Sequence, residues 1–261
     1  MDAKIISTKN RKAQVTLFVI MALVILAVLL LFVALPKIKI PSVVTKISDP
    51  SSFIEQCIAE AGKKAVNLLI ENNGYLEAPF HILYQDKKVP YLCYNKNFYQ
   101  PCIPQNPLFI QHLEKEITSY VKPKISACFD SLALEAEKKG DKIELGAMEV
   151  KTSLGDKVNI IVNRNLKLSH LDAVSAISQF RAAFSSPLYS LASLAGEIVA
   201  QEARFCNFEY LGYMILHPQF KIEKTQVGSI NNQSIIYKIK DKKTNQAMAL
   251  AVKGCSLPQS F

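Results

Sequence analysis

The chain contains one uninterrupted run of 19 apolar residues, from Leu17 to Leu35. A helix buried in a soluble domain shows an apolar stripe along one side, whereas this run would be apolar on every side. With Val15 and Thr16 the segment has 21 residues, and a helix of that length spans roughly 30 Å, the thickness of a bilayer core. Residues 15–35 are therefore predicted to form a transmembrane helix.

Charged residues on the two sides of this run set its predicted direction. Four basic residues precede it, Lys4, Lys9, Arg11 and Lys12, and three follow it, Lys37, Lys39 and Lys46. The basic excess before the run places the N-terminus in the cytoplasm. The run is also too long for a cleaved secretory signal and is not followed by a small-x-small cleavage site. We thus expect a basic cytoplasmic leader (1–14), a single-pass membrane helix (15–35), a linker (36–50) and a domain outside the membrane (51–261).

Residues 11–20, Arg-Lys-Ala-Gln-Val-Thr-Leu-Phe-Val-Ile, resemble the class III signal of archaeal type IV prepilins. In that family a basic leader is cut after a small residue, and the hydrophobic helix remains on the mature protein. The resemblance implies cleavage between Ala13 and Gln14. Two features depart from the family: Phe18 stands at the fifth mature position, where many pilins have Glu, and the outer domain is larger and richer in Cys than a pilin head.

The chain as a whole is similar to membrane-anchored surface proteins of small-genome archaea. The segments that carry this likeness are Phe53–Cys57 and Pro187–Tyr189. The likeness implies a single-pass surface protein and no particular activity.

Hydrophobic periodicity predicts an α+β domain, with an antiparallel sheet packed on helices. The expected helices are one begun by a Ser52–Glu55 capping box and ended at Gly74, one from Asn106–Pro107 to Pro123, one from Lys124 to about Lys138, and one from Ser186–Pro187. Pro123 is expected to separate the second helix from the third, because proline lacks the helical donor. The expected strands are 147–153, 158–163, 165–168, 176–185, 220–223, 235–239 and 247–252, with an irregular aromatic hairpin between Tyr75 and Ile103.

Six cysteines all follow the predicted membrane helix. An even number of cysteines outside the cytoplasm predicts disulfides. We expect three bonds, which pair Cys93 with Cys102, Cys57 with Cys128, and Cys206 with Cys255. Buried free thiols are the alternative. A zinc site is not expected, because the chain has no C-x-x-C pair and no closely spaced His pair near its cysteines.

Two surface features are candidate contact sites. The aromatic hairpin offers Tyr84, Tyr91, Tyr94 and Tyr99 as partner-contact residues, although filling the core of the hairpin is the alternative role. A basic strand end contains Lys238, Lys240, Lys242 and Lys243, with Lys253 nearby. It is suited to lipid head groups or an acidic polymer, or else it is a solvated edge strand. Asn232 heads the sequon Asn-Gln-Ser and is the candidate glycan site.

The sequence contains no motif that is typical of an enzyme active site. Its four histidines lie outside H-E-x-x-H, no G-x-S-x-G elbow is present, and its nine glycines form no phosphate-binding loop. His112 and Glu116 are four residues apart, but a solvated polar helix face accounts for them better than a shared ligand. No catalytic residue, metal, cofactor or small-molecule substrate is therefore expected. Nucleic acid is disfavoured by the predicted side of the membrane.

The expected protein is a non-enzymatic, membrane-anchored surface protein, whose partners are the lipid bilayer and itself or another envelope protein. It is either a pilin-like structural subunit or a permanently anchored binding or adhesion module that does not polymerise. An anchored enzyme assembled from distant residues is the remaining rival, with His81 and His217 as its starting candidates.

Overall fold

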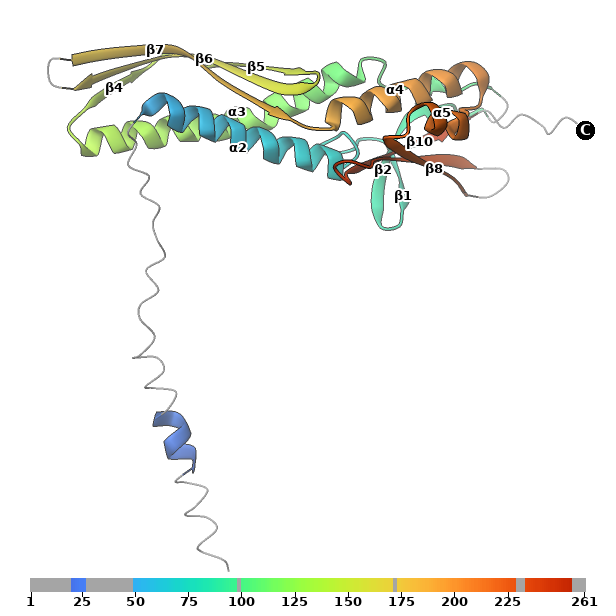
Figure 1. Ribbon diagram of the computed structural model, residues 1–261, viewed down its shortest axis with the longest axis horizontal. Helices are drawn as coiled ribbons and strands as arrows, with labels where there is room; N and C mark the ends of the chain where they lie inside the picture. The colour runs from blue at the N-terminus through green and yellow to red at the C-terminus, as the bar shows by residue number, and fades with distance from the viewer. Residues whose placement is uncertain (1–19, 27–48, 98–99, 171–172, 229–232, 255–261) are drawn as a thin grey trace, which may run out of the picture. The chain divides into compact units, whose positions relative to one another are not determined.

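The computed structural model describes residues 20–26, 49–97, 100–170, 173–228 and 233–254 (Figure 1). The chain divides into two units, 1–48 and 49–261. Within the predicted membrane span, residues 20–26 are described and helical. The rest of that span, and the cleavage candidates Ala13 and Gln14, lie outside the described residues. None of the helices in the described ranges is both long and apolar enough to cross a membrane.

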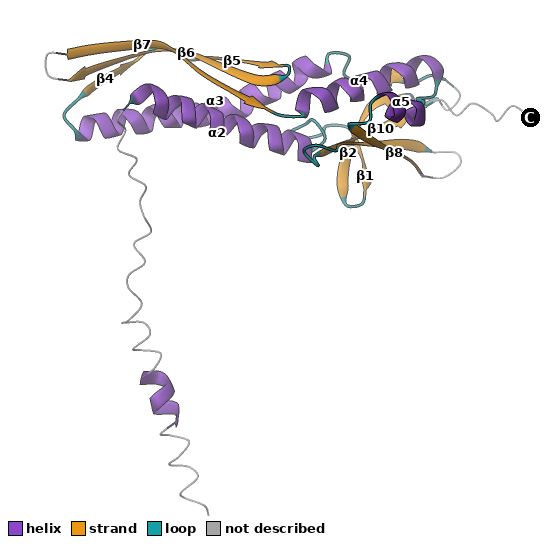
Figure 2. Cartoon of the chain, viewed as in Figure 1, coloured by secondary structure: helices purple, strands orange, loops and turns teal. Residues whose placement is uncertain are grey.

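The described residues between 49 and 254 fold into helices packed on two sheets (Figure 2). The helices are α2 (Pro50–Glu71), α3 (Phe109–Lys138), α4 (Leu188–Phe205) and α5 (Tyr210–Leu216). The four-stranded sheet contains β4 (Lys142–Leu145), β5 (Glu149–Leu154), β6 (Lys157–His170) and β7 (Ala173–Ser185). The six-stranded sheet contains β1 (His81–Tyr84), β2 (Lys87–Tyr94), β3 (Ile103–Pro104), β8 (Phe220–Val227), β9 (Ser234–Asp241) and β10 (Ala247–Lys253).

Antiparallel pairing dominates both sheets. The six-stranded sheet has the order β1-β2-β10-β9-β8, and β3 pairs with β2. Its β2–β10 pair is parallel. In the other sheet, β4 and β5 pair with β6 at successive positions, and β7 also pairs with β6. The predicted α+β class is confirmed at this level.

The start of α2 differs from the prediction. The side chain of Asp49 accepts hydrogen bonds from the backbone N–H groups of Ser51 (3.1 Å) and Ser52 (3.2 Å), so Asp49 is the N-cap. The capping box begun by Ser52 was wrong because a carboxylate three residues earlier already satisfies these donors, and Pro50 suits the first helical position.

Helix α3 runs through Pro123 without a break, which corrects the prediction of two helices. Pro123 is exposed, while Val121 and Ile125 on either side of it are fully buried. A proline inside a helix costs about 3 kcal/mol. Burying an aliphatic side chain contributes about 1.5–3 kcal/mol, so the two neighbours offset that cost. The buried stripe therefore continues from Phe109 to Ala136.

The strand predictions identified the meander but divided it incorrectly. One strand, β6, replaces the two expected at 158–163 and 165–168, because a register shift between Asn163 and Leu166 absorbs the irregularity without ending the strand. The guanidinium of Arg164 donates from Nε to the carbonyl of Gly146 (3.0 Å), beside this shift. Strand β4 and helix α5 were not predicted, since neither is long enough to show a clear periodicity.

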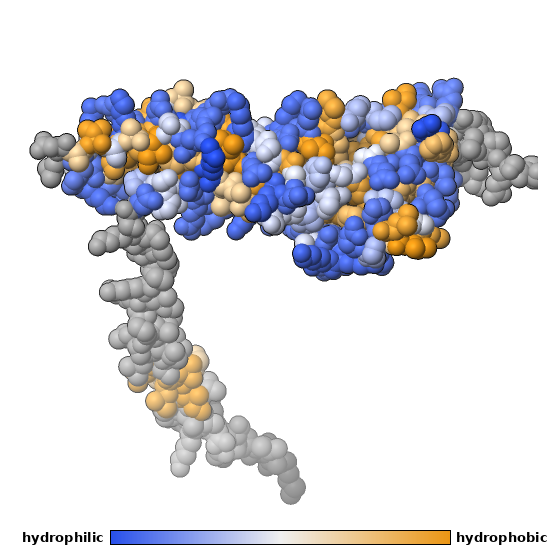
Figure 3. Space-filling view, turned by 45° about the horizontal axis from the view of Figure 1, so that its top comes forward, coloured by the Kyte–Doolittle hydropathy of each residue, from blue (hydrophilic) through white to orange (hydrophobic). Residues whose placement is uncertain are grey.

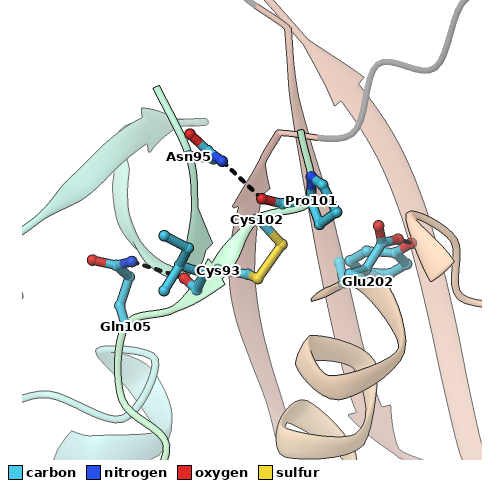
Figure 4. The surroundings of a disulfide bond; sticks show 8 residues. Cys93, Asn95, Pro101, Cys102, Gln105 and Glu202 are labelled. Carbon is cyan, nitrogen blue, oxygen red and sulfur yellow. Dashed lines mark hydrogen bonds between the residues drawn. A yellow bond between two sulfur atoms is a disulfide. The ribbon is translucent and has the colours of Figure 1, made fainter. Parts of the chain in front are cut away.

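Two of the three predicted cysteine pairs lie at disulfide distance. Cys57 of α2 faces Cys128 of α3, with 6.6 Å between the Cα atoms. Cys93 of β2 faces Cys102, with 5.3 Å between the Cα atoms (Figure 4). Both separations are usual for disulfides. The third predicted pair includes Cys255, which lies outside the described residues.

The main core lies between the helices and the two sheets. α2 packs against α3 and β7, and α3 also packs against β5. Phe129 of α3 and Phe180 of β7 meet edge to face, with 5.3 Å between ring centres, and both are fully buried. A second, smaller cluster of Val89, Ile236 and Ala251 is flanked by Tyr84 and Tyr91 of the β1–β2 hairpin. This smaller cluster lies beneath the candidate site.

Candidate functional site

A groove between the β1–β2 hairpin and strands β9 and β10 combines apolar and basic side chains. Its apolar floor includes Val89, Ile236 and Met248, which are almost fully buried, with exposed fractions of 2%, 1% and 2%. Tyr84 and the β9–β10 turn also line the groove, whose volume is about 410 Å³. We name it the basic groove. Its volume lies within the range of small-ligand pockets, about 300–1,000 Å³.

Three ammonium groups give the basic groove its charge. Lys87 comes from β2, and Lys238 and Lys240 come from β9. Glu71, at the end of α2, is the one acidic residue among the residues that line it. Lys87 and Lys238 are exposed and Lys240 is half-buried, so their charges remain accessible to solvent and to a ligand. The groove therefore favours an anionic ligand.

The charged face that contains the lysines of β9 continues onto the neighbouring strand β8. Glu223 lies opposite Lys238, and Lys221 lies opposite Lys240, so the four side chains share one face of the sheet. The pKa of Glu223 is lowered, first because Lys221 donates a hydrogen bond to it (2.7 Å) and also because Lys238 and Lys240 attract its charge. The positive charges of Lys238 and Lys240 therefore also act on a side chain of β8, outside the groove.

Asn73 fixes the walls of the basic groove relative to one another. It follows α2 in the left-handed conformation (φ 60°) and is 6% exposed. Its side-chain N–H donates to the carbonyl of Lys88 (3.0 Å), and its side-chain oxygen accepts from the backbone N–H of Ala249 (2.7 Å). One buried amide thus ties the helix end to both β2 and β10.

The predicted contact tyrosines fall into two groups. Tyr84 lines the basic groove. Tyr91 and Tyr94 instead form a cluster with Phe80, with ring centres 4.7–5.3 Å apart. The hydroxyl of Tyr91 is 3.0 Å from Oγ of Ser234, and Nζ of Lys253 is 5.3 Å from the centre of the Tyr94 ring. Tyr99 and the glycan candidate Asn232 lie outside the described residues.

The basic strand end is also divided by the fold. Lys238 and Lys240 reach the basic groove, whereas Nζ of Lys242 donates to the carbonyl of Pro218 (2.7 Å). Lys243 lines a different cavity of about 510 Å³ between α2, the start of α4 and the β9–β10 turn. Sequence reasoning missed Lys87, Asn73 and Glu71. The positive charge of Lys87 beside an aromatic hairpin was the only available signal.

The histidines named as enzyme or ligand candidates have local structural partners. Nε2 of His112 is 3.2 Å from the carbonyl oxygen of Gly74 and 3.7 Å from Oε1 of Glu116, whose Oε2 accepts from the N–H of Leu76 (3.3 Å). Burial lowers the pKa of His112. Nδ1 of His81 is 3.0 Å from the carbonyl oxygen of Ala78, and the His217 ring stacks on Tyr213. His112 and Glu116 therefore hold the chain that follows α2, which is a structural role.

One buried group of ionisable side chains lies away from the groove. Glu202 of α4 and Tyr237 of β9 are both 0% exposed, and the Tyr237 hydroxyl donates to Oε1 of Glu202. Nζ of Lys224 lies 3.7 Å from the same oxygen. Figure 4 shows Glu202 near the Cys93–Cys102 pair. With two of its three members closed to solvent, this group is suited to stability and not to binding.

The ranges that the structure describes contain no cluster of three or more His, Cys, Asp or Glu that could hold a metal ion.

The visible face in Figure 3 carries hydrophilic side chains over most of the domain, with apolar patches between them. Comparison with protein-family models, with curated proteins and with solved structures finds no match.

Proposed function

We propose that the chain is a non-enzymatic, membrane-anchored surface protein whose outer domain binds an acidic polysaccharide in the basic groove. The observation that carries this proposal is the convergence of Tyr84 with Lys87, Lys238 and Lys240 around an apolar floor. These side chains come from the β1–β2 hairpin and from β9, which are far apart in the chain.

The anchor is supported by the 19 apolar residues from Leu17 to Leu35. A position outside the cytoplasm is supported by the six cysteines that follow this run, two pairs of which lie at disulfide distance. Disulfides persist in oxidising compartments and are rare in the cytosol. Both observations favour an envelope protein that faces outward.

An acidic sugar chain matches the groove better than a neutral or a purely apolar ligand. Lysine ammonium groups bind carboxylates or sulfates as flexible point charges. The ring of Tyr84 and the apolar floor can pack against the non-polar faces of sugar rings. Charged and apolar contacts are thus available at the same time in one open groove.

Tetragalacturonate is the probe for this proposal. We expect the full-length chain in detergent micelles to bind it, and the double variant Lys238→Glu/Lys240→Glu to bind it at least tenfold more weakly, since each charge-assisted hydrogen bond is worth about 1.5–3 kcal/mol. Isothermal titration calorimetry measures both affinities. Binding should also weaken as salt is raised.

The control variant is Lys142→Glu/Lys151→Glu, which changes the net charge equally on the four-stranded sheet. Each of these lysines is exposed and pairs with a neighbouring glutamate. Such surface pairs contribute about 0–1 kcal/mol, so the fold should tolerate the change. An equal loss of affinity in the control, or equal binding of the neutral tetrasaccharide maltotetraose, would refute a specific acidic site.

A pilin-like structural subunit is the second candidate, and residues 11–20 favour it through their resemblance to a class III signal. Cleavage between Ala13 and Gln14 is then expected, followed by bundling of the hydrophobic helix with its copies. Mass-spectrometric mapping of the mature N-terminus in protein from its native envelope tests this. A start at Gln14 supports the subunit, whereas an intact leader supports a permanent anchor.

A further inference from the structure

Three of the four sheet edges in the described domain carry features that oppose pairing with another strand. At one edge of the six-stranded sheet, β8 carries Lys221, Glu223 and Lys224, and at the other β1 has only four residues. The edge formed by β4 and β5 is interrupted between Leu145 and Glu149 and carries two Lys–Glu pairs. Short length, interruption and charge are the usual protection of exposed edges.

The fourth edge, β7, lacks this protection. It is 13 residues long, and Arg181 is its only charged residue. Within the described ranges, β7 pairs with β6 alone. Its first seven residues, Ala173–Gln179, contain no charge, and all of them are exposed except the half-buried Ile177. We name this segment the free half of β7.

Helix α2 lies against the second half of β7. The carboxylate of Glu55 accepts from the backbone N–H of Arg181 (3.5 Å), and a Cβ placed on Gly62 would lie 2.9 Å from the ring of Phe184. In Figure 1 the start of β7 extends past the first turn of α2. The free half is therefore an uncharged strand edge, next to the half of β7 that α2 covers.

We propose that two copies of this chain pair through the free half of β7, antiparallel and centred on Ala176, to form one continuous sheet. This register places Ala173 opposite Gln179, Val174 opposite Ser178, and Ser175 opposite Ile177 of the partner copy. No charge opposes a like charge, so the segment is complementary to itself. Such a twofold pairing closes on itself and uses both free edges.

The first test replaces Ala176 with Cys in the full-length chain in detergent micelles, with treatment by a short bismaleimide. Residues opposite each other in an antiparallel pair lie within about 5.5 Å, so we expect a covalent dimer. The matched control is Ala183→Cys, an exposed alanine of the same strand outside the free half. Cross-linking at Ala183 equal to that at Ala176, or none at Ala176, would overturn the proposal.

The second test places charge on the edge. In the variant Val174→Lys/Ser178→Lys, lysines of the two copies oppose each other, and we expect the dimer to dissociate at least tenfold more readily in analytical ultracentrifugation. The control Ser119→Lys/Ser131→Lys adds the same charge at exposed positions of α3. An unchanged dimer in the first variant overturns the proposal, because association through other segments would survive it. Neither test involves the basic groove, so each proposal can fail alone.

Discussion

Replacing Cys57 and Cys128 with alanine is expected to lower the free energy of unfolding by about 4 kcal/mol. The two residues are 71 positions apart, and the bond between them closes the chain from α2 to α3. In the chain-entropy model, such a link restricts the unfolded chain more strongly as the loop lengthens. It also joins two helices whose buried stripes pack in the same core. In α2 this stripe runs from Ile54 to Ile70.

Urea unfolding of the full-length chain in detergent micelles measures this effect. Tyrosine fluorescence is the probe, because the chain has 10 Tyr and no Trp. The control is Cys93→Ala/Cys102→Ala, whose residues are only nine positions apart. Its expected loss is smaller, about 2.5–3 kcal/mol, because the loop is short. An equal or larger loss in the control would contradict the loop-length argument.

Sequence patterns predicted those parts of the fold that depend on local periodicity. The stripe of α2 and the strands β9 and β10 arise from regular burial. The Cys57–Cys128 pair follows from the facing stripes of two helices, and the Cys93–Cys102 pair from its short spacing across the aromatic hairpin. Pro123 misled the prediction because its helix is maintained by tertiary packing, which local propensity does not contain.

The basic groove could be predicted only in fragments. Tyr84 and the lysines of β9 were recognised as separate features, but Tyr84 and Lys238 are 154 positions apart. Their meeting depends on the parallel pairing of β2 with β10 and on the bridge made by Asn73. Neither has a signature in the sequence, since an asparagine after a helix usually serves only as a local cap.

Replacing Glu202 with alanine is expected to lower the free energy of unfolding by about 3–5 kcal/mol. Glu202 continues the buried stripe of α4 after Ile198 and Val199, and it is 0% exposed. The substitution leaves the Tyr237 hydroxyl without its acceptor and removes the carboxylate that lies 3.7 Å from Nζ of Lys224. The unpaired hydroxyl costs about 1–3 kcal/mol and the cavity left by the buried side chain adds to this loss, whereas Lys224 is 19% exposed and still donates to Oδ1 of Asn207 (3.1 Å).

The matched variant is Glu202→Gln, which keeps the shape and an acceptor for Tyr237. It should cost less, about 1–3 kcal/mol, because the hydrogen bond survives while the attraction to Lys224 is lost. Urea unfolding ranks the two variants. A Glu202→Ala protein as stable as the wild type would show that the group contributes nothing to the fold.

The pH dependence of stability provides a separate test of the same group. Burial, followed by the hydrogen bond to Glu202 and by its charge, raises the pKa of Tyr237 above its usual 10. A raised pKa in the folded state favours the neutral phenol, so this contribution is fully present below pH 10 and is lost as pH rises above it, where the unfolded chain releases the proton. The substitution Tyr237→Phe removes the phenolic hydroxyl and with it the proton that the unfolded chain would release. We therefore expect its stability, measured by urea unfolding between pH 9 and 11, to fall less steeply than that of the wild type, and an identical slope would contradict the buried hydrogen bond.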